Sequence, residues 1–377
     1  MCGGLPVAGI SYRMGKGRRR HRMMDISDKN LERAGELHRE MEVVDMHRDL
    51  PGELLFRHRS GEREVLGNRY LERWKAAGVR VVVCSVYLED DVLPDGALRN
   101  TLLQIAALQS EVDSLRGQGV LIRGRDDLEK ARRDGAIGFL LYLEGLDGMG
   151  TDTGLLRLFH QMGVRGAALT WSRRNSLATG CCRANEEKET HGGISESGWE
   201  TIDRMAELGW FLDVSHLNDD GMGEILGLYG SDAGRKVPKL PVIATHSDAR
   251  AVCRHYRNLT DAQIDSLAES GGIIGINAYS RLAGSYESGE HLEALYRQAA
   301  YLIDRAGKDY VCYGLDLCHS YEMARREIEE EGRGMDCLSD YDELVRLTAY
   351  LLEKGMTEQQ IRKLSGENAL RFLERVL

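Results

Sequence analysis

The chain has 377 residues, of which 42% are hydrophobic and 29% charged, and its formal net charge is −10 at pH 7. This is the composition of a globular protein with a large core, and the acidic balance argues against nucleic acid as the main partner. No run of 18 apolar residues occurs, so we expect no membrane-spanning helix. The eight cysteines are scattered without a CxxC pair, which favours reduced thiols and a cytoplasmic location.

The first 23 residues precede any periodic pattern and contain the basic run KGRRRHR at 16–22. We interpret residues 1–23 as a disordered basic tail or a wrongly assigned start, and a nucleic-acid-binding arm is the less favoured interpretation. The segment lacks the apolar stretch of a secretory signal. Residues 24–377 are expected to form one catalytic domain.

From residue 43 onward, eight short apolar runs alternate with amphipathic, helix-like stretches. The runs read as near-continuously apolar, which is typical of parallel strands covered on both sides. Amphipathic stretches at 98–115, 199–209 and 291–307 have helical spacing. An eightfold βα alternation predicts an α/β fold of the (β/α)8 TIM-barrel type. The expected strands are 43–47, 79–88, 136–145, 164–171, 211–216, 241–247, 271–279 and 310–317.

A doubly wound open sheet is the competing architecture, but no GxGxxG motif follows an expected strand. Residues 120–124 (VLIRG) are a candidate extra strand, which would raise the number of strands from eight to nine. The polar segments 173–198 and 318–340 are expected to be long loops.

Chemically versatile side chains stand near the ends of five expected strands. In the first, His47 and Asp49 are two residues apart, so strand alternation would point both to one face and Arg48 to the other. The carboxyl ends of barrel strands converge on one face, where active sites of this fold lie. The residues brought there would be His47, Asp49, Glu144, His216, His246 and Asp316.

Five of these residues are too many for one catalytic zinc ion, which commonly has three protein ligands. They suit two ions if His47 and Asp49 hold one, His216 and His246 hold the other, and Glu144 bridges. Imidazole and carboxylate ligands favour zinc, although manganese, iron or cobalt suit the same set. A hydroxide held between two ions would attack a carbonyl, and the remaining Asp316 would serve as general base and then acid. The set therefore predicts metal-assisted hydrolysis.

Several ordered motifs extend this interpretation from about residue 43 to the C-terminus. They are HRDLP, YLEG, GWFLDVSH, PVIATHSDARAVCRHYRNLTD, GLDL and SGENALRFL. Together they resemble the membrane (renal) dipeptidase family of zinc peptidases, within the amidohydrolase superfamily, in a bacterial-type version. The resemblance implies two zinc ions on the five ligands above, Asp316 as proton shuttle, and a homodimer. It also implies that Arg257, followed by Asn258, binds the free C-terminal carboxylate of a dipeptide, which a guanidinium fork can hold bidentately.

Three positions depart from the family pattern. Trp171, in LTWSRRN, stands where animal members have a histidine that polarises the scissile carbonyl, so Trp171 Nε1–H or a metal would replace it. The family's DFDG is here Asp316-Leu317-Cys318-His319, and Arg48 replaces an asparagine. These changes leave the expected ligands intact but bear on substrate choice.

The leading hypothesis is a zinc-dependent dipeptidase that hydrolyses unblocked dipeptides, including those with a D-residue on the C-terminal side. A second hypothesis is another amidohydrolase reaction, such as deacylation of an N-acyl amino acid. A third is a catalytically silent barrel with a binding or structural role. The intact set of ligands and Asp316 disfavours the third.

Overall fold

The parallel sheet of the protein curls into a nearly closed barrel. The computed structural model describes residues 26–182, 188–228, 240–285, 290–325 and 336–377, so the expected basic segment at 1–23 lies outside the described residues. Neighbouring strands follow the order β7-β6-β5-β4-β2-β1-β9-β8, and every pair is parallel. A parallel bridge between Ala244 and Ile274 joins the two ends of this path.

All eight expected strands are present, which confirms the α/β barrel prediction. The candidate extra strand is real as well: β3 pairs with the first half of β4 on the edge where β5 pairs with the second half. The strands are β1 (Val43–Arg48), β2 (Val79–Val86), β3 (Gly119–Leu121), β4 (Ile137–Glu144), β5 (Val164–Ala168), β6 (Phe211–Asp213), β7 (Val242–Ile243), β8 (Ile274–Ile276) and β9 (Val311–Tyr313).

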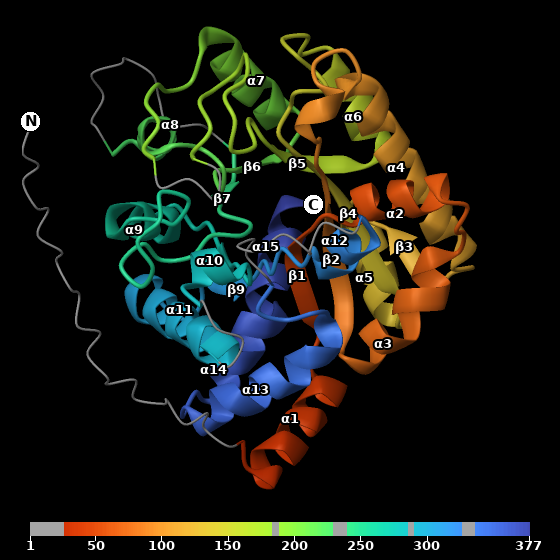
Figure 1. Ribbon diagram of the computed structural model, residues 1–377, viewed down its shortest axis with the longest axis vertical. Helices are drawn as coiled ribbons and strands as arrows, with labels where there is room; N and C mark the ends of the chain where they lie inside the picture. The colour runs from red at the N-terminus through yellow and green to blue at the C-terminus, as the bar shows by residue number, and fades with distance from the viewer. Residues whose placement is uncertain (1–25, 183–187, 229–239, 286–289, 326–335) are drawn as a thin grey trace, which may run out of the picture.

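Helices surround the strands (Figure 1). The three expected helices correspond to α4, α7 and α11, and α11 is followed by Gly307 with a φ of +94°, a conformation that favours glycine. The helices are α1 (Asp28–Glu40), α2 (Leu50–Arg59), α3 (Leu71–Ala76), α4 (Ala97–Ser114), α5 (Arg125–Asp134), α6 (Leu155–Met162), α7 (Glu196–Glu207), α8 (Asp219–Leu226), α9 (Asp261–Glu269), α10 (Ser280–Ala283), α11 (His291–Ala306), α12 (His319–Arg325), α13 (Leu344–Glu353), α14 (Glu358–Arg362) and α15 (Asn368–Val376).

The two segments expected to be long loops contain some regular structure. In the first, Ala178 bridges to Ile194 and α7 already begins at Glu196. In the second, α12 occupies its first residues. Short 3-10 and π-helical turns complete the described elements, at Asp90–Val92, Tyr341–Glu343, Leu66–Tyr70 and Lys363–Glu367.

Two apolar layers hold the barrel together. The larger lies between the strands and the surrounding helices. The smaller fills the barrel interior with side chains such as Val44, Val83 and Phe211, and Phe372 and Leu373 of α15 pack against them. Helix α15 overlaps the middle of the barrel in Figure 1. Because α15 and this apolar layer fill the interior at the start of the strands, the polar side chains that face the interior gather at the carboxyl ends.

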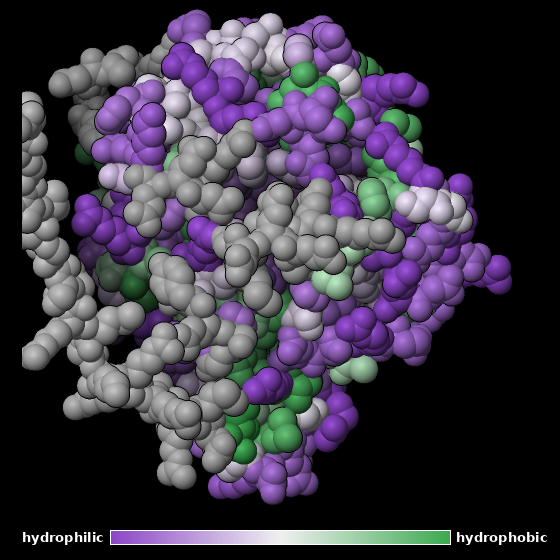
Figure 2. Space-filling view, viewed as in Figure 1, coloured by the Kyte–Doolittle hydropathy of each residue, from purple (hydrophilic) through white to green (hydrophobic). Residues whose placement is uncertain are grey.

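The described part of the face shown in Figure 2 is mainly polar. Hydrophilic side chains dominate the face shown in Figure 2, and hydrophobic ones form smaller areas between them. Among the described residues, no helix is long and apolar enough to cross a membrane. The seven cysteines in the described ranges are all free thiols.

The closure of the barrel depends on a close backbone contact at Gly275. A Cβ atom there would lie 1.9 Å from the carbonyl oxygen of Thr245, next to the closing bridge. We expect Gly275→Ala to lower the free energy of unfolding by about 1–3 kcal/mol, the usual cost of overpacking, or to prevent folding. Denaturant unfolding measures the change.

Gly124→Ala is the matched control, because a Cβ at Gly124 meets no atom within 4 Å and its backbone is extended. Equal unfolding midpoints for Gly275→Ala and the wild-type protein would contradict the importance of this contact.

Candidate metal centre

Three imidazoles converge on one carboxylate oxygen at the carboxyl ends of the strands. Glu144 Oε1 lies 2.8 Å from His216 Nε2, 3.2 Å from His246 Nε2 and 3.4 Å from His47 Nε2. Asp49 Oδ1 lies 3.7 Å from His47 Nε2. The structure therefore brings all five predicted ligands together, with Glu144 in the middle.

The local path of β1 differs from simple strand alternation. Its pairing register with β2 shifts between Asp45 and Arg48, where three steps along β1 match two along β2. Val44 and Met46 point into the barrel, so regular alternation would point His47 outward. The register shift turns His47 into the barrel as well. Asp49 lies beyond the strand, at the residue preceding α2. The two side chains meet as expected, but a register shift and a helix start bring them together rather than alternation.

Arg48 points away from the cluster, as expected. Its guanidinium carbon lies 4.8 to 5.6 Å from the ring centroids of Tyr70, Trp74 and Tyr341, and Nη1 donates to Asp340 Oδ1 at 3.1 Å. The side chain is buried outside the strands, where aromatic faces and a carboxylate stabilise its charge.

A buried aspartate organises the histidine side of the cluster. Asp213 Oδ1 accepts the backbone N–H groups of Ser215 and Thr245 and the Ser215 hydroxyl, at 2.6 to 3.0 Å. Its Oδ2 accepts the hydroxyls of Tyr142 at 2.5 Å and Thr245 at 2.6 Å. Thr245 Oγ1 also contacts His246 Nδ1 at 2.7 Å. Asp213 thus both caps backbone and orients a ligand through Thr245.

Two serine hydroxyls that the sequence did not single out hold the predicted ligands His216 and Glu144. Ser172 Oγ lies 2.9 Å from His216 Nδ1, and Ser85 Oγ donates to Glu144 Oε2 at 3.1 Å. These contacts leave His216 Nε2 and Glu144 Oε1 facing each other. Serines near strand ends are so common that a single sequence does not show which of them hydrogen-bond to metal-ligand candidates.

The electrostatics of the cluster favour neutral His216 and His246 beside an ionised Glu144. Burial, followed by the charge of Arg257, lowers the pKa of His216 to about 4, and burial also lowers that of His246. Burial alone would raise the pKa of Glu144, but the surrounding imidazoles hold it well below its usual value. Burial alone would lower the pKa of His47, but Glu144 and Asp49 raise it. His47 therefore lies where positive charge is most favourable.

The donor atoms fit metal ions. His47 Nε2 and Asp49 Oδ1 are buried and have no hydrogen-bond partner among the described residues. Buried polar atoms normally have one, so orphaned atoms beside carboxylates indicate a cation. Two overlapping triads meet the spacing of ligands around one ion, namely His47, Asp49 and Glu144, and Glu144, His216 and His246.

Asp316 lies at the edge of this centre. Its Oδ1 is 3.8 Å from His47 Nε2, and its Oδ2 accepts from Asn277 Nδ2 at 3.2 Å. The Asp316 backbone has a φ of +55° and donates its N–H to the His47 carbonyl at 3.1 Å. Burial, together with the charges of Asp49 and Glu144, raises the pKa of Asp316 to about 7.

The predicted substrate-binding residues lie mainly on the His216 side. Arg257 Nη2 is 3.2 Å from His216 Nε2 and donates to the His246 carbonyl, while Nη1 donates to Ser247 Oγ. The Trp171 ring centroid is 5.8 Å from that of His216. Asn258 uses its amide N–H groups on the carbonyls of Cys253 and Leu282, so its contacts anchor a loop.

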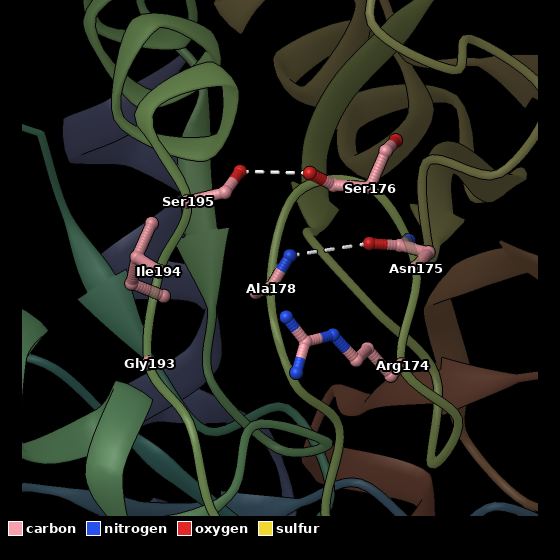
Figure 3. Close-up of a pocket in the computed structure, with 7 residues that line it drawn as sticks. All are labelled: Arg174, Asn175, Ser176, Ala178, Gly193, Ile194 and Ser195. Atoms are coloured by element: carbon pink, nitrogen blue, oxygen red, sulfur yellow. Dashed lines mark hydrogen bonds between the residues drawn. The ribbon is translucent and has the colours of Figure 1, made fainter.

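Two cavities differ in their relation to the centre. One, of about 220 Å³, begins at Asp49 and is lined by residues that include Tyr87, Gln104, Tyr321 and Arg325. The other, of about 160 Å³, lies between the segments 174–178 and 193–195, where Ser195 Oγ donates to the Ser176 carbonyl (Figure 3). Only the first cavity is lined by a predicted ligand.

Comparisons with known proteins agree with this geometry. The chain is 26% identical to dipeptidase tcpJ of Claviceps purpurea over 83% of this chain and 70% of that protein. It is 27% identical to dipeptidase verJ of Clonostachys rogersoniana over 94% and 89%. A crystallised metallopeptidase of Rhodobacter sphaeroides, bound to a phosphinate mimic of the dipeptide L-Ala-D-Ala, is 26% identical and has a TM-score of 0.76. That comparison covers 89% of this chain and 99% of that one.

The family assignment rests on nearly the whole described barrel. Residues 31–377 match the membrane dipeptidase family, peptidase family M19. The match spans all of the described strands and all five predicted ligands. The chain belongs to the membrane dipeptidase family of metallopeptidases.

Proposed function

We propose that this protein is a zinc-dependent dipeptidase that hydrolyses unblocked dipeptides, with residues 24–377 acting as one catalytic domain. The observation that carries the proposal is the convergence of His47, His216 and His246 on Glu144 Oε1. Three imidazoles around one buried carboxylate oxygen, with a second carboxylate nearby, form the donor set of a two-metal hydrolase.

Two ions would be held by His47 with Asp49 and by His216 with His246, and Glu144 would bridge them. When bound, such ions supply Lewis acidity and lower the pKa of a water molecule toward about 7. Imidazole and carboxylate donors favour zinc, although manganese, iron or cobalt fit the same set. Neutral His216 and His246 have their Nε2 lone pairs available for this role.

Asp316 is the proposed proton shuttle. It accepts a proton from the attacking water and returns it to the leaving amine. Asn277 holds one carboxylate oxygen of Asp316, and the bond from its backbone to His47 keeps the group at the edge of the centre. Partial exposure of the Asp316 side chain, 24%, leaves it open to substrate.

Arg257 is the proposed anchor for the C-terminal carboxylate of the dipeptide, because its guanidinium lies against His216 and His246. The N-terminal residue would then extend toward Asp49 and the cavity beside it. The ligand of the Rhodobacter sphaeroides relative mimics the dipeptide L-Ala-D-Ala, which supports L-D dipeptides as substrates. Trp171, near His216, and Asn258, beside Arg257, would border the same subsite.

Deacylation of N-acyl amino acids is the second candidate. Trp171, which stands where animal members have a histidine, bears on the choice between the two substrate classes. Its ring packs against that of Tyr87, with centroids 5.1 Å apart. A homodimer and a cytoplasmic location remain predictions, and light scattering at micromolar concentration tests the former.

A library of dipeptides with both stereochemistries, assayed beside N-acyl amino acids, tests the proposal. We expect two metal ions per chain and faster turnover of free dipeptides. Preferred turnover of N-acyl amino acids would favour the second candidate. A single ion per chain, with Glu144→Gln harmless, would exclude the two-metal centre.

Thr245 is expected to support metal binding through His246. Thr245→Val removes the hydroxyl that joins Asp213 to His246 Nδ1, so we expect a roughly 10- to 100-fold loss of metal affinity. Competition with a chelator measures the affinity. Thr170→Val is the control, since the Thr170 hydroxyl is buried without a hydrogen-bond partner among the described residues. Equal metal affinities in Thr245→Val and Thr170→Val would argue against a role of Thr245 in holding His246.

Asp316→Asn is expected to reduce kcat by roughly 10²–10⁴-fold, the usual share of general acid–base catalysis, while metal content stays unchanged. Steady-state kinetics and metal analysis of the same preparation measure both quantities. Loss of metal together with activity would make Asp316 a ligand instead of a proton shuttle.

Arg257→Leu is expected to lower kcat/KM for dipeptides by roughly 10- to 150-fold, since a charge-assisted hydrogen-bonded pair contributes about 1.5–3 kcal/mol. Dipeptide amides should be poor substrates of the wild-type enzyme, and Arg257→Leu should lower kcat/KM for these amides only slightly further. Arg257→Lys should restore only part of the activity, because an ammonium lacks the guanidinium fork. Equal losses for dipeptides and amides would indicate a structural role.

A further inference from the structure

Cys318 replaces the second aspartate of the family's DFDG sequence, and its thiol faces the metal centre. Cys318 Sγ lies 3.6 Å from Asp49 Oδ2 and 3.8 Å from Asp316 Oδ1. Asp49 Oδ2 is the oxygen turned away from His47, because Oδ1 is the atom close to His47 Nε2. The thiol therefore contacts Asp49 Oδ2, an oxygen that the proposed resident ions do not need as a ligand.

The backbone holds this thiol in position. Asp336 Oδ2 accepts the N–H groups of Cys318 and His319, each at 2.7 Å. The Cys318 carbonyl accepts the N–H groups of Tyr321 and Glu322 at the start of α12, each at 2.9 Å. Hydrogen bonds on both sides of the residue fix the direction of its side chain.

The spacing of the three donors matches a coordination shell. Bond lengths of about 2.3 Å to sulfur and about 2.1 Å to oxygen, at a tetrahedral angle, put the sulfur about 3.6 Å from each oxygen. Asp49, Asp316 and Cys318 meet the ligand spacing of one ion, and all three are partly exposed. This group of three donors adjoins the proposed resident ligand His47. The buried His47 Nε2, unpartnered among the described residues, lies 3.8 Å from Asp316 Oδ1.

The charges around the thiol are unfavourable for an anion and favourable for a cation. The Cys318 thiol lies beside the carboxylates of Asp49 and Asp316. Without a cation, the S–H group can donate to these carboxylates. A divalent cation would neutralise the carboxylates and take the sulfur lone pair, and the thiol proton would pass to the solvent.

We propose that Asp49 Oδ2, Asp316 Oδ1 and Cys318 Sγ form an accessory site for a thiophilic divalent cation, such as cadmium or excess zinc, at the rim of the metal centre. Thiolate donors select such ions over magnesium or calcium. Occupation of this site inhibits the enzyme, because the cation holds the carboxylate that transfers protons. The inhibitory part of this inference rests on the proposed function, whereas the binding part does not.

Titration of the metal-reconstituted enzyme with cadmium tests the site. We expect thiolate-to-cadmium charge-transfer absorption in the ultraviolet, saturating at one equivalent, together with loss of dipeptidase activity. In Cys318→Ser the absorption should be absent. The cadmium concentration for half-inhibition should rise at least ~10-fold, since even indirect partners of a metal ligand contribute that much affinity.

Cys337→Ala is the matched control, because the Cys337 thiol packs in the hydrophobic core. This variant should keep both the absorption and the inhibition. A second test uses the wild-type protein, so it does not require any variant to fold. Cadmium should protect Cys318 from alkylation by iodoacetamide, as mapped by peptide mass spectrometry.

Absence of thiolate absorption in the wild-type protein, or its persistence in Cys318→Ser, would overturn the accessory site. So would alkylation of Cys318 that cadmium does not slow. Absorption that depends on Cys318 in a protein without dipeptidase activity would support the cation site and reject the proposed function. Cadmium binding at Cys318 without inhibition would reject the inhibitory role.

Discussion

The structure depends on one buried carboxylate shared by three imidazoles. Glu144 is 3% exposed, and an ionised carboxyl group at such a depth is costly unless opposite charge or hydrogen bonds compensate. Its Oε1 faces the three histidines, while its Oε2 accepts from Ser85. Around this atom the barrel interior changes from apolar to polar, and a cation is the natural complement of the negative charge gathered there.

The barrel supplies this environment by dividing its interior. Side chains of the strands and of α15 fill one end with apolar contacts, which keeps water and polar groups away from it. At the other end, Asp213 collects hydrogen bonds from two neighbouring strand ends and holds Thr245 against His246. Of the predicted ligands, His47 and Glu144 lie on strands. His216 and His246 follow the ends of β6 and β7, and hydroxyl side chains hold their rings.

The departures from the family pattern lie around the metal centre and leave its proposed ligands intact. Arg48 is directed outward into an aromatic cage, so its exchange for asparagine leaves the ligands undisturbed. Trp171 borders His216, and Cys318 contacts Asp49 and Asp316. Shared ligands with altered neighbours are consistent with a common hydrolytic chemistry and a substrate range or metal sensitivity particular to this protein.

The strands, the barrel and the five clustered residues could be predicted from the sequence, because hydrophobic periodicity is local and the ends of parallel strands converge. Only the tertiary structure decided how they meet. The register shift in β1 that turns His47 inward depends on the pairing of β1 with β2. β3 can pair with the first residues of β4 because β5 pairs only with the later residues of β4. The support of His246 by Asp213, and the approach of Cys318 to Asp49, join residues far apart in the chain. Such contacts are set by backbone register and loop closure, which no local pattern of residues encodes.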